Sequence, residues 1–304
     1  MLGVFAQARF APGPDRFTSS VRLDQLHELE EWVKGLRSPR WPEHLGGPYT
    51  IDPGLAARGE KLYRSNCVAC HALRDPDGRF PQNLDVASEL DPNVIRVVAT
   101  PLEVLRTDPK FLMNFGAKSS ADSLADLVSA GRDDQVPRPA LLQAVVRQVI
   151  GRTLAEQGLT PGSEEFQRRL AQLGGFRRAA GAPPLGGRGY KSRPLDGAWA
   201  TAPYLHNGSV PNLEQMLLPE EDRVDSFYLG SRRFDPVRVG FETGPGQRRF
   251  EFRSEQSDGS HLAGNSNLGH SGPRFTQTTG QDGAYRDFLG EERRALIEFI
   301  KTIE

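Results

Sequence analysis

The sequence predicts a mainly α fold with long loop-rich insertions and a small β-ribbon. Several segments carry apolar residues at the three- and four-residue spacing of an amphipathic helix. The 304 residues include 32 Gly and 23 Pro, which interrupt regular structure and favour long loops. Short aromatic and β-branched runs between Phe227 and Phe252 are the best strand candidates and indicate the ribbon.

The amino-terminal part predicts two helices separated by a linker. Leu23–Leu36 forms the first, since its leucines, Trp32 and Val33 recur at helical spacing. Ser38–Pro53 contains four prolines and is expected to be extended. Leu55–Ser65 forms the second helix, which includes Gly59.

The remaining chain predicts more helices and one irregular stretch. Gly174–Gly197 is dense in Gly and Pro and should lack regular structure. The closing helix places Leu296, Phe299, Ile300 and Ile303 on one face. The predicted helices are Ala99–Phe115, Ala121–Ala130, Pro139–Gln157, Glu164–Leu173 and Glu291–Ile303.

Charge argues against nucleic acid as the main partner, and hydropathy argues against a membrane-spanning helix. The chain has 38 Lys and Arg against 39 Asp and Glu, for a net charge of −1. Nucleic acid as the main partner would need a basic excess, which is missing. No apolar run approaches the roughly 20 residues that a membrane-spanning helix needs, so we expect no membrane span.

The clearest chemical motif is C-x-x-C-H at Cys67, Cys70 and His71. Two thiols on one tight turn can add to both vinyl groups of a porphyrin, and the following imidazole can then ligate the iron. A zinc site would need further Cys or His ligands at metal spacing, and the chain has only these two cysteines. A redox C-x-x-C pair normally opens a helix after a strand, whereas this pair follows a predicted helix. The motif therefore predicts covalently bound haem c.

The segments that flank the motif have the layout of a cytochrome c-type haem domain. A helix of the form G-x-x-L-Y precedes the motif, and an amphipathic helix closes the chain. In that layout the two helices cross closely, with Gly59 allowing the backbones to approach and Phe299 or Ile300 packing against it. We expect residues 51–304 to form this domain with its insertions, and residues 1–50 to be the tail of a preceding domain plus a linker.

The second axial ligand of the iron decides what the haem can do. A His or Met ligand gives an electron-transfer centre, whereas an open position permits peroxide or dioxygen chemistry. His270 lies among small and amide residues in G-N-S-N-L-G-H, and His206 lies in a loop tightened by Pro203 and Gly208. Each has a plainer interpretation as a solvated or hydrogen-bonded His. The other candidates are His27, His44, Met113, Met216 and His261, of which the two Met residues are expected in the core.

From Tyr190 onward the chain resembles the dihaem cytochrome c peroxidase superfamily. The resemblance rests on Tyr190–Leu213, which contains T-A-P-Y-x-H-x-G at Thr201–Gly208. Phe227–Phe241 and Gly264–His270 are similar to the branch of the rubber oxygenases, the RoxA-like and RoxB-like latex-cleaving proteins. The similarity covers roughly residues 22–304 and is specific in the second half.

The resemblance implies a protein with two haem domains, of which this chain matches the carboxy-terminal one. In the rubber oxygenases the amino-terminal haem reacts with oxygen, and the carboxy-terminal haem, whose iron has two His ligands, serves electron transfer. That arrangement favours His270 as the partner of His71. In the peroxidases a Met takes this place, but the matching position here is near Glu220.

Three further residues take possible roles from the same resemblance. The carbonyls of Thr201 and Pro203 match groups that help to bind calcium in the peroxidases, where the remaining ligands come from the other domain. Calcium is therefore a candidate second cofactor. Trp199 either lies near the haem and assists electron transfer or is a core aromatic residue.

Three functions are open at this point. The first is an electron-transfer haem domain of a dihaem oxidoreductase, whose reactive haem lies outside this chain, either in a second haem domain or in a redox partner protein. The second is a self-sufficient single-haem peroxidase or oxygenase, for which no distal acid–base motif is seen. The third is a standalone electron-carrier cytochrome, against which the insertion at Arg74–Gly197 argues. The sequence leaves open whether the chain is itself catalytic.

The expected location follows from the haem chemistry. Met1–Phe10 lacks the basic and apolar regions of a signal peptide. Haem attachment to C-x-x-C-H takes place on the oxidising side of the bacterial inner membrane, so we expect a periplasmic or secreted protein and interpret the chain as a fragment.

Overall fold

A computed structural model describes residues 6–75, 77–78, 80, 98–120, 124, 127, 135–173, 189–245 and 250–304. The chain divides into two compact units. The first unit combines Met1–Leu36 with Met113–Gly186, and the second combines Arg37–Leu112 with Gly187–Glu304. The insertion is therefore divided: its part Met113–Gly186 belongs to the unit of the amino-terminal segment, whereas its first part, up to Leu112, belongs to the unit of the helix that precedes the motif.

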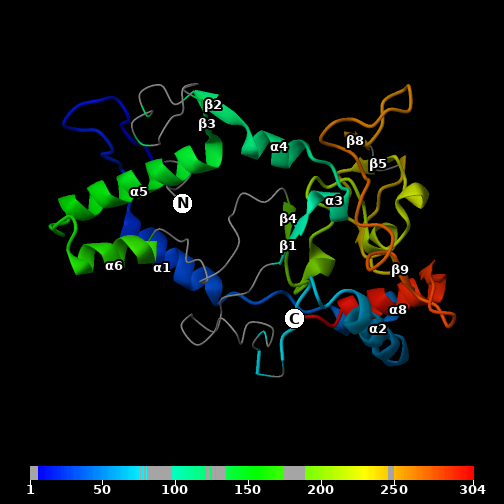
Figure 1. Cartoon of the computed structure of the whole chain (residues 1–304). Helices are drawn as coiled ribbons and strands as arrows, with labels where there is room; N and C mark the ends of the chain where they lie inside the picture. The colour runs from blue at the N-terminus through cyan, green and yellow to red at the C-terminus, as the bar shows by residue number, and fades with distance from the viewer. Residues whose placement is uncertain are drawn as a thin grey trace. The chain divides into compact units, whose positions relative to one another are not determined.

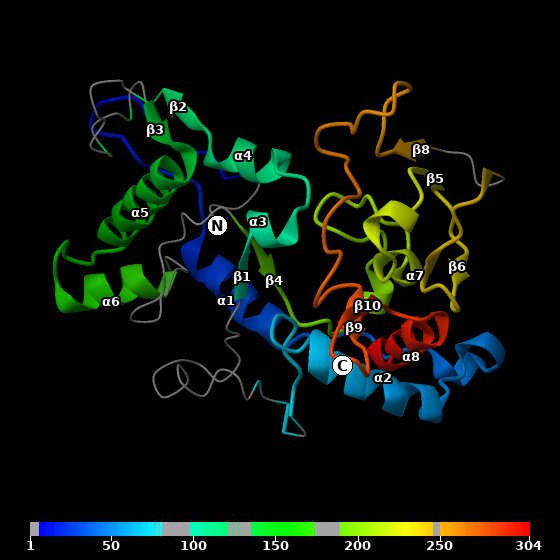
Figure 2. The same ribbon diagram turned by 45° about the vertical axis from the view of Figure 1, so that its right-hand side comes forward.

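The first unit is built on three helices, α1 (Leu23–Lys34), α5 (Arg138–Glu156) and α6 (Glu164–Leu173). Figures 1 and 2 show α5 and α6 as a connected helical pair. A two-stranded ribbon, β2 (Lys118–Ser120) with β3 (Gln135–Pro137), precedes α5. The core of this unit is Phe17, Val21, Leu23, Val145, Val149, Ile150, Leu154, Phe166 and Leu173.

The second unit is organised around two crossing helices, α2 (Pro53–Asn66) and α8 (Gly290–Ile300), which lie side by side in both views (Figures 1 and 2). Its other helical elements are η1 (Glu43–Leu45), η2 (Gly47–Tyr49), α3 (Leu102–Leu105), η5 (Ala198–Ala200), α7 (Leu213–Met216) and η6 (Glu220–Asp222). The helix α4 (Lys110–Gly116) crosses the boundary between the two units in sequence.

Short antiparallel ribbons complete the second unit. β1 (Val98–Pro101) pairs with β4 (Gly189–Ser192), so that Val98 lies opposite Ser192. The other pairs are β5 (Ser226–Leu229) with β8 (Phe250–Arg253), β6 (Phe234–Asp235) with β7 (Gly240–Phe241), and β9 (Gln277–Thr279) with β10 (Tyr285–Asp287). The core of the unit is Trp41, Tyr63, Leu73, Leu213, Leu217, Val239, Phe288, Leu296, Ile297, Ile300 and Ile303.

The predicted approach of the two flanking helices is confirmed. Asp52 caps α2 by accepting a hydrogen bond from the Leu55 N–H (2.9 Å). A Cβ atom added at Gly59 would overlap the carbonyl of Ala295 on α8 and lie 2.9 Å from Cβ of Phe299. The ring of Phe299 meets that of Tyr63, with centroids 5.2 Å apart. Only glycine allows the two backbones to come this close.

The prediction of a mainly α fold with one small ribbon is wrong. Helices account for 39% and strands for 14% of the structure, and the described residues contain five separate two-stranded sheets. The sequence signal for these strands is weak because each is only two to four residues long. In the pair of β1 with β4, moreover, the partners lie far apart in the chain.

Individual elements show where the sequence pattern was and was not sufficient. The helices expected at Leu23–Leu36, Leu55–Ser65, Pro139–Gln157, Glu164–Leu173 and Glu291–Ile303 are present with small changes of boundary. Ala99–Phe115 is instead a strand followed by two short helices. The expected linker Ser38–Pro53 holds η1 and η2 and buries Trp41, because a large aromatic residue gains more from the core than from solvent. Ala121–Ala130 lies almost wholly outside the described residues.

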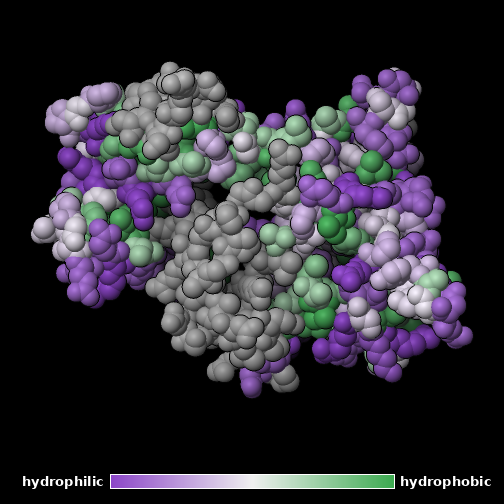
Figure 3. Space-filling model, viewed as in Figure 1, coloured by the Kyte–Doolittle hydropathy of each residue, from purple (hydrophilic) through white to green (hydrophobic). Residues whose placement is uncertain are grey.

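The expected domain boundary at residue 50 stays a prediction, and the contacts of the structure mark a division at Leu36. Among the described helices, none combines the length and apolar character needed to cross a membrane. On the face shown in Figure 3, hydrophilic residues interrupt the apolar areas of the second unit.

Gly59→Ala should weaken the second unit, because the new methyl group cannot fit against the Ala295 carbonyl without separating the helices. Overpacking of this kind typically lowers the free energy of unfolding by about 2 to 3 kcal/mol. Chemical denaturation measures the loss. Gly290→Ala in α8 is the control, since its added Cβ meets only the flexible end of Arg293 at 3.9 Å. Equal stability of the two variants would contradict the close helix contact.

Candidate haem site

The C-x-x-C-H motif lies on the turn that ends α2. The Cys67 N–H still donates to the carbonyl of Tyr63 (2.8 Å), so the turn continues directly from the helix. The Cys70 and His71 N–H groups both donate to the carbonyl of Cys67, at 3.1 and 2.8 Å. Residues at positions i, i+3 and i+4 of a helical turn share one side. The backbone therefore presents both thiols and the imidazole together.

The imidazole of His71 is oriented by a backbone hydrogen bond. Its Nδ1 lies 2.6 Å from the carbonyl oxygen of Arg193, to which a protonated Nδ1 donates. Burial lowers the pKa of His71, although this hydrogen bond acts in the opposite direction. A neutral ring with its proton on Nδ1 leaves the lone pair of Nε2 free for a metal ion. His71 is thus set up as a metal ligand.

The thiol of Cys67 does not have the pKa of a reactive redox cysteine. Burial, followed by the neighbouring Cys70, raises the pKa of Cys67 to about 12. Reactive C-x-x-C cysteines have a lowered pKa instead. Both cysteines are free in the structure. Tyr63, which is fully buried, donates its hydroxyl to the carbonyl of His71 (2.9 Å) and fixes the end of the motif.

His270 faces His71 across the site. Their ring centroids are 6.3 Å apart and their planes are inclined by 55°. Two imidazoles that bind one metal ion from opposite sides, each through a bond of about 2 Å, have centroids roughly 6 Å apart. Nδ1 of His270 is buried and has no hydrogen-bond partner. Burial, followed by the neighbouring His71 and Arg223, lowers the pKa of His270 to about 3. A neutral imidazole with this placement fits an iron ligand.

The backbone around His270 is held in an unusual conformation. His270 has φ +50°, in the left-handed region that costs a non-glycine residue about 1 to 2 kcal/mol. Its N–H donates to the carbonyl of Leu105 (2.9 Å). Gly269, with φ +84°, lies so close that an added Cβ would overlap the backbone of Leu105 and Thr107. Strain of this kind persists where the surroundings determine the conformation.

Polar side chains fix the rest of this segment, Gly264–His270, which we call the ligand loop. Buried Asp108 accepts hydrogen bonds from the N–H groups of Gly264 (2.8 Å) and Ser266 (3.3 Å) through one oxygen. The side-chain amide of Asn207 donates to the carbonyls of the same two residues, at 3.2 and 2.9 Å. Side-chain hydrogen bonds therefore fix both the N–H and the carbonyl groups at this end of the loop.

The structure places His206 and Trp199 in aromatic clusters. The ring of His206 stacks on Tyr190 with centroids 4.2 Å apart, and no ring contact joins it to His71 or His270 among the described residues. The indole of Trp199 packs edge-on against Trp41 at 5.3 Å and donates to the carbonyl of Pro39 (3.1 Å). Trp199 thus packs against the core of its unit, and the roles of His206 and Trp199 at a haem stay predictions.

The proposed calcium residues and the other ligand candidates lie elsewhere. The hydroxyl of Thr201 donates to the carbonyl of Ala198 (2.9 Å), and a cis peptide bond precedes Pro203. Within the described residues, no cluster of three or more His, Cys, Asp or Glu side chains could hold a metal ion. Met113 is 65% exposed, so its expected place in the core is wrong, and His261 lies 3.6 Å from Glu255.

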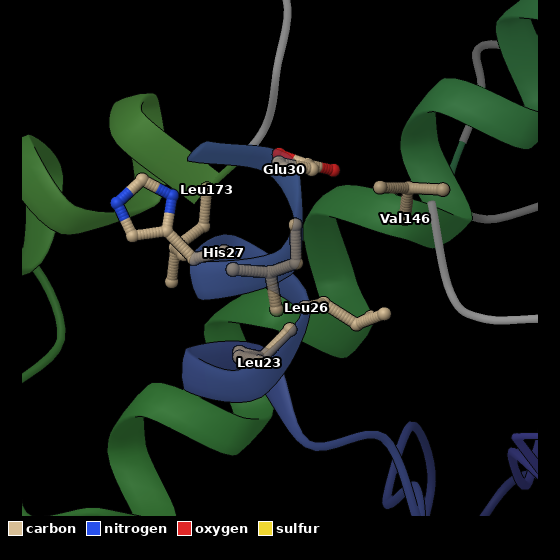
Figure 4. Close-up of a pocket in the computed structure, with 7 residues that line it drawn as sticks. Leu23, Leu26, His27, Glu30, Val146 and Leu173 are labelled. Atoms are coloured by element: carbon tan, nitrogen blue, oxygen red, sulfur yellow. The ribbon is translucent and has the colours of Figure 1, made fainter. Parts of the chain in front are cut away.

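A small pocket in the first unit contains one of the candidate axial ligands, His27, but not the C-x-x-C-H motif or His270. Leu23, Leu26, Val146 and Leu173 line it together with His27 and Glu30 (Figure 4). Nε2 of His27 lies 3.0 Å from the side-chain amide of Gln172. This histidine is thus part of the packing of the first unit.

Sequence reasoning missed the residues that hold His270 in place. Asp108, Asn207 and Arg223 carry no recognisable motif, and they reach the ligand loop from distant parts of the chain. The carbonyl of Arg193, which orients His71, could not be found either, since any residue supplies a carbonyl. Only the contacts in the folded chain identify these three side chains and this carbonyl as supports of the two histidines.

A comparison with family models supports a cytochrome c-like domain from a part of the chain outside the C-x-x-C-H motif. A family model described as RoxA-like, cytochrome c-like matches residues 189–228, a stretch that includes Trp199 and His206. The match supports a cytochrome c-like domain of the RoxA-like family, and with it the binding of haem c and iron.

Two curated relatives are proteins of Sinorhizobium fredii (strain NBRC 101917 / NGR234). Uncharacterized protein y4iJ is 33% identical over 303 residues, which cover 94% of this chain and 46% of that protein. Uncharacterized protein y4iM is 25% identical over 261 residues, covering 84% and 50% respectively. The chain therefore spans about half the length of these relatives.

Gly269→Ala should displace the ligand loop, because the added methyl group overlaps the backbone at Leu105. Gly272→Ala is the matched control, since Gly272 also has a left-handed φ of +90° but has open space around it. The unfavourable φ destabilises both variants, whereas the steric overlap destabilises Gly269→Ala alone. We expect Gly269→Ala to lose about 2 kcal/mol more in the free energy of unfolding. Indistinguishable denaturation curves would rule out the close approach.

Proposed function

We propose that this chain is a haem c-binding electron-transfer domain of a dihaem oxidoreductase, with its iron held between His71 and His270. The observation that carries the proposal is the opposed pair of imidazoles, 6.3 Å apart, beside two free cysteines. Both rings have a lowered pKa and are neutral at physiological pH, as iron ligation requires.

The residues of the motif would attach and orient the haem. Cys67 and Cys70 would each hold the haem through a thioether bond, which the addition of a thiol across a vinyl group would supply. The Arg193 carbonyl keeps Nε2 of His71 unprotonated and directed away from the backbone. The ligand loop presents His270 from the opposite side. A haem bound here supplies one-electron transfer between its ferric and ferrous states.

The larger assembly is part of the same proposal. The resemblance of Tyr190–Leu213 to the dihaem peroxidase superfamily supports a second haem domain, or a redox partner protein, that contains the reactive haem. The C-x-x-C-H motif, as an attachment sequence for haem c, supports a periplasmic or secreted location. Calcium at Thr201 and Pro203 is proposed only at an interface with that second domain. A further C-x-x-C-H motif encoded in frame upstream would separate the dihaem protein from a standalone carrier.

Replacement of His270 by Ala should convert the ferric haem from low spin to high spin, because the sixth ligand is lost. Absorption and electron paramagnetic resonance spectra measure the change on purified haem-loaded protein. His206→Ala is the control, since this ring stacks on Tyr190 and should leave the spectrum unchanged. A high-spin spectrum for His206→Ala, with His270→Ala unaffected, would reverse the ligand assignment.

The reduced wild-type protein should bind carbon monoxide slowly, since His270 must leave the iron first. Stopped-flow mixing of the dithionite-reduced protein with carbon monoxide gives the rate. A rate that is limited by ligand release and does not rise with carbon monoxide concentration is expected. Rapid, concentration-dependent binding would mean an open iron site and would favour a self-sufficient peroxidase or oxygenase.

A further inference from the structure

A buried arginine lies behind the ligand loop. The side chain of Arg223 makes five hydrogen bonds, all to backbone carbonyls. Nη1 donates to Asn267 and Gly269, each at 2.7 Å, and Nη2 donates to His270 at 3.0 Å. Nη2 and Nε also donate to Leu218, at 3.1 and 3.3 Å. Only 4% of the residue is exposed.

The guanidinium of Arg223 donates its hydrogen bonds to carbonyls, most of them in the ligand loop, rather than to a carboxylate. Among the described residues, its hydrogen bonds go to main-chain oxygens, which a charged donor binds more strongly than a neutral one does. Burial lowers the pKa of Arg223 to about 10, while Glu220 and Glu221 act in the opposite direction. The guanidinium thus stays protonated at neutral pH. Glu220 instead pairs with Arg106 and accepts the Gly269 N–H (2.6 Å).

The loop that Arg223 binds has a strained backbone, so hydrogen bonds are needed to keep its conformation. His270 is in the left-handed region with φ +50°, and Gly269 next to it has φ +84°. Three of the last four residues of the loop give their carbonyls to the one guanidinium. A planar fork with five N–H donors can bind this set of carbonyls at once, whereas a lysine ammonium has three donors on a flexible stem.

We propose that Arg223 is the positioning residue for His270, holding the carbonyls of the ligand loop so that the imidazole stays opposite His71. The inference rests on the proposed function, since it assigns a role toward the iron that this function requires. Arg223 does not touch the haem in this account. It acts through the backbone of residues 267–270.

The test compares haem-loaded Arg223→Lys and Arg223→Met with the wild type. Carbon monoxide binding to the reduced protein should become about tenfold faster or more in Arg223→Met, because each loop opening exposes the iron. Arg223→Lys should show a smaller increase, since it keeps the charge but fewer hydrogen bonds. The ferric spectrum of Arg223→Met should gain a high-spin component that added imidazole returns to low spin.

Arg238→Met is the matched control, because Arg238 is an exposed arginine of the same unit that pairs with Glu214 at 3.1 Å. It should leave the spectrum and the carbon monoxide rate unchanged. If Arg223→Met does not yield folded protein, Arg223→Lys and Glu220→Gln decide the question, since Glu220 binds the N–H of Gly269 in the same loop. Circular dichroism establishes that each variant used is folded.

The outcomes separate this inference from the proposed function. A low-spin wild type, together with faster carbon monoxide binding in the folded Arg223 variants, supports the positioning role. A low-spin wild type whose folded Arg223 variants bind carbon monoxide at the wild-type rate overturns it and leaves the function intact. A wild type that is high spin, or that carries no covalent haem, overturns both.

Discussion

The site depends on one constraint, which is that two imidazoles from distant parts of the chain, those of His71 and His270, must face each other at close range. His71 is positioned by the end of α2 and by the carbonyl of Arg193. His270 is positioned by the ligand loop, whose last N–H donates to the carbonyl of Leu105 in α3. The 6.3 Å between the two rings is maintained only while both supports stay fixed. The close contact of α2 with α8 at Gly59 sets the first support.

The two supports differ in their physical nature. The His71 side is held by continuous helix, an apolar core and a single hydrogen bond to the Arg193 carbonyl. The His270 side has no regular secondary structure, so its backbone groups must be satisfied by side chains. Asp108 and Arg223 supply a charged acceptor and a charged donor for this purpose. Hydrogen bonds to charged groups contribute about 1.5 to 3 kcal/mol each, enough to offset the strain at His270.

The sequence could predict the parts of the site whose chemistry is local. The turn at Cys67–His71 was readable because haem attachment needs those residue types at that spacing, and the helix contact at Gly59 followed from the layout of the flanking segments. The importance of His270 came from the resemblance to a family. The sequence could not predict Arg223 or the pairing of β1 with β4, because these contacts join distant segments and leave no periodic pattern. The fold class was wrong for the same reason.

The most direct test is an anomalous difference map, recorded at the iron absorption edge from crystals of the haem-loaded protein. The account predicts one iron peak between the imidazoles of His71 and His270, within bonding distance of Nε2 of His71 and of a ring nitrogen of His270. An iron bound to His71 alone, with His270 turned away, or an iron bound to another residue would contradict it.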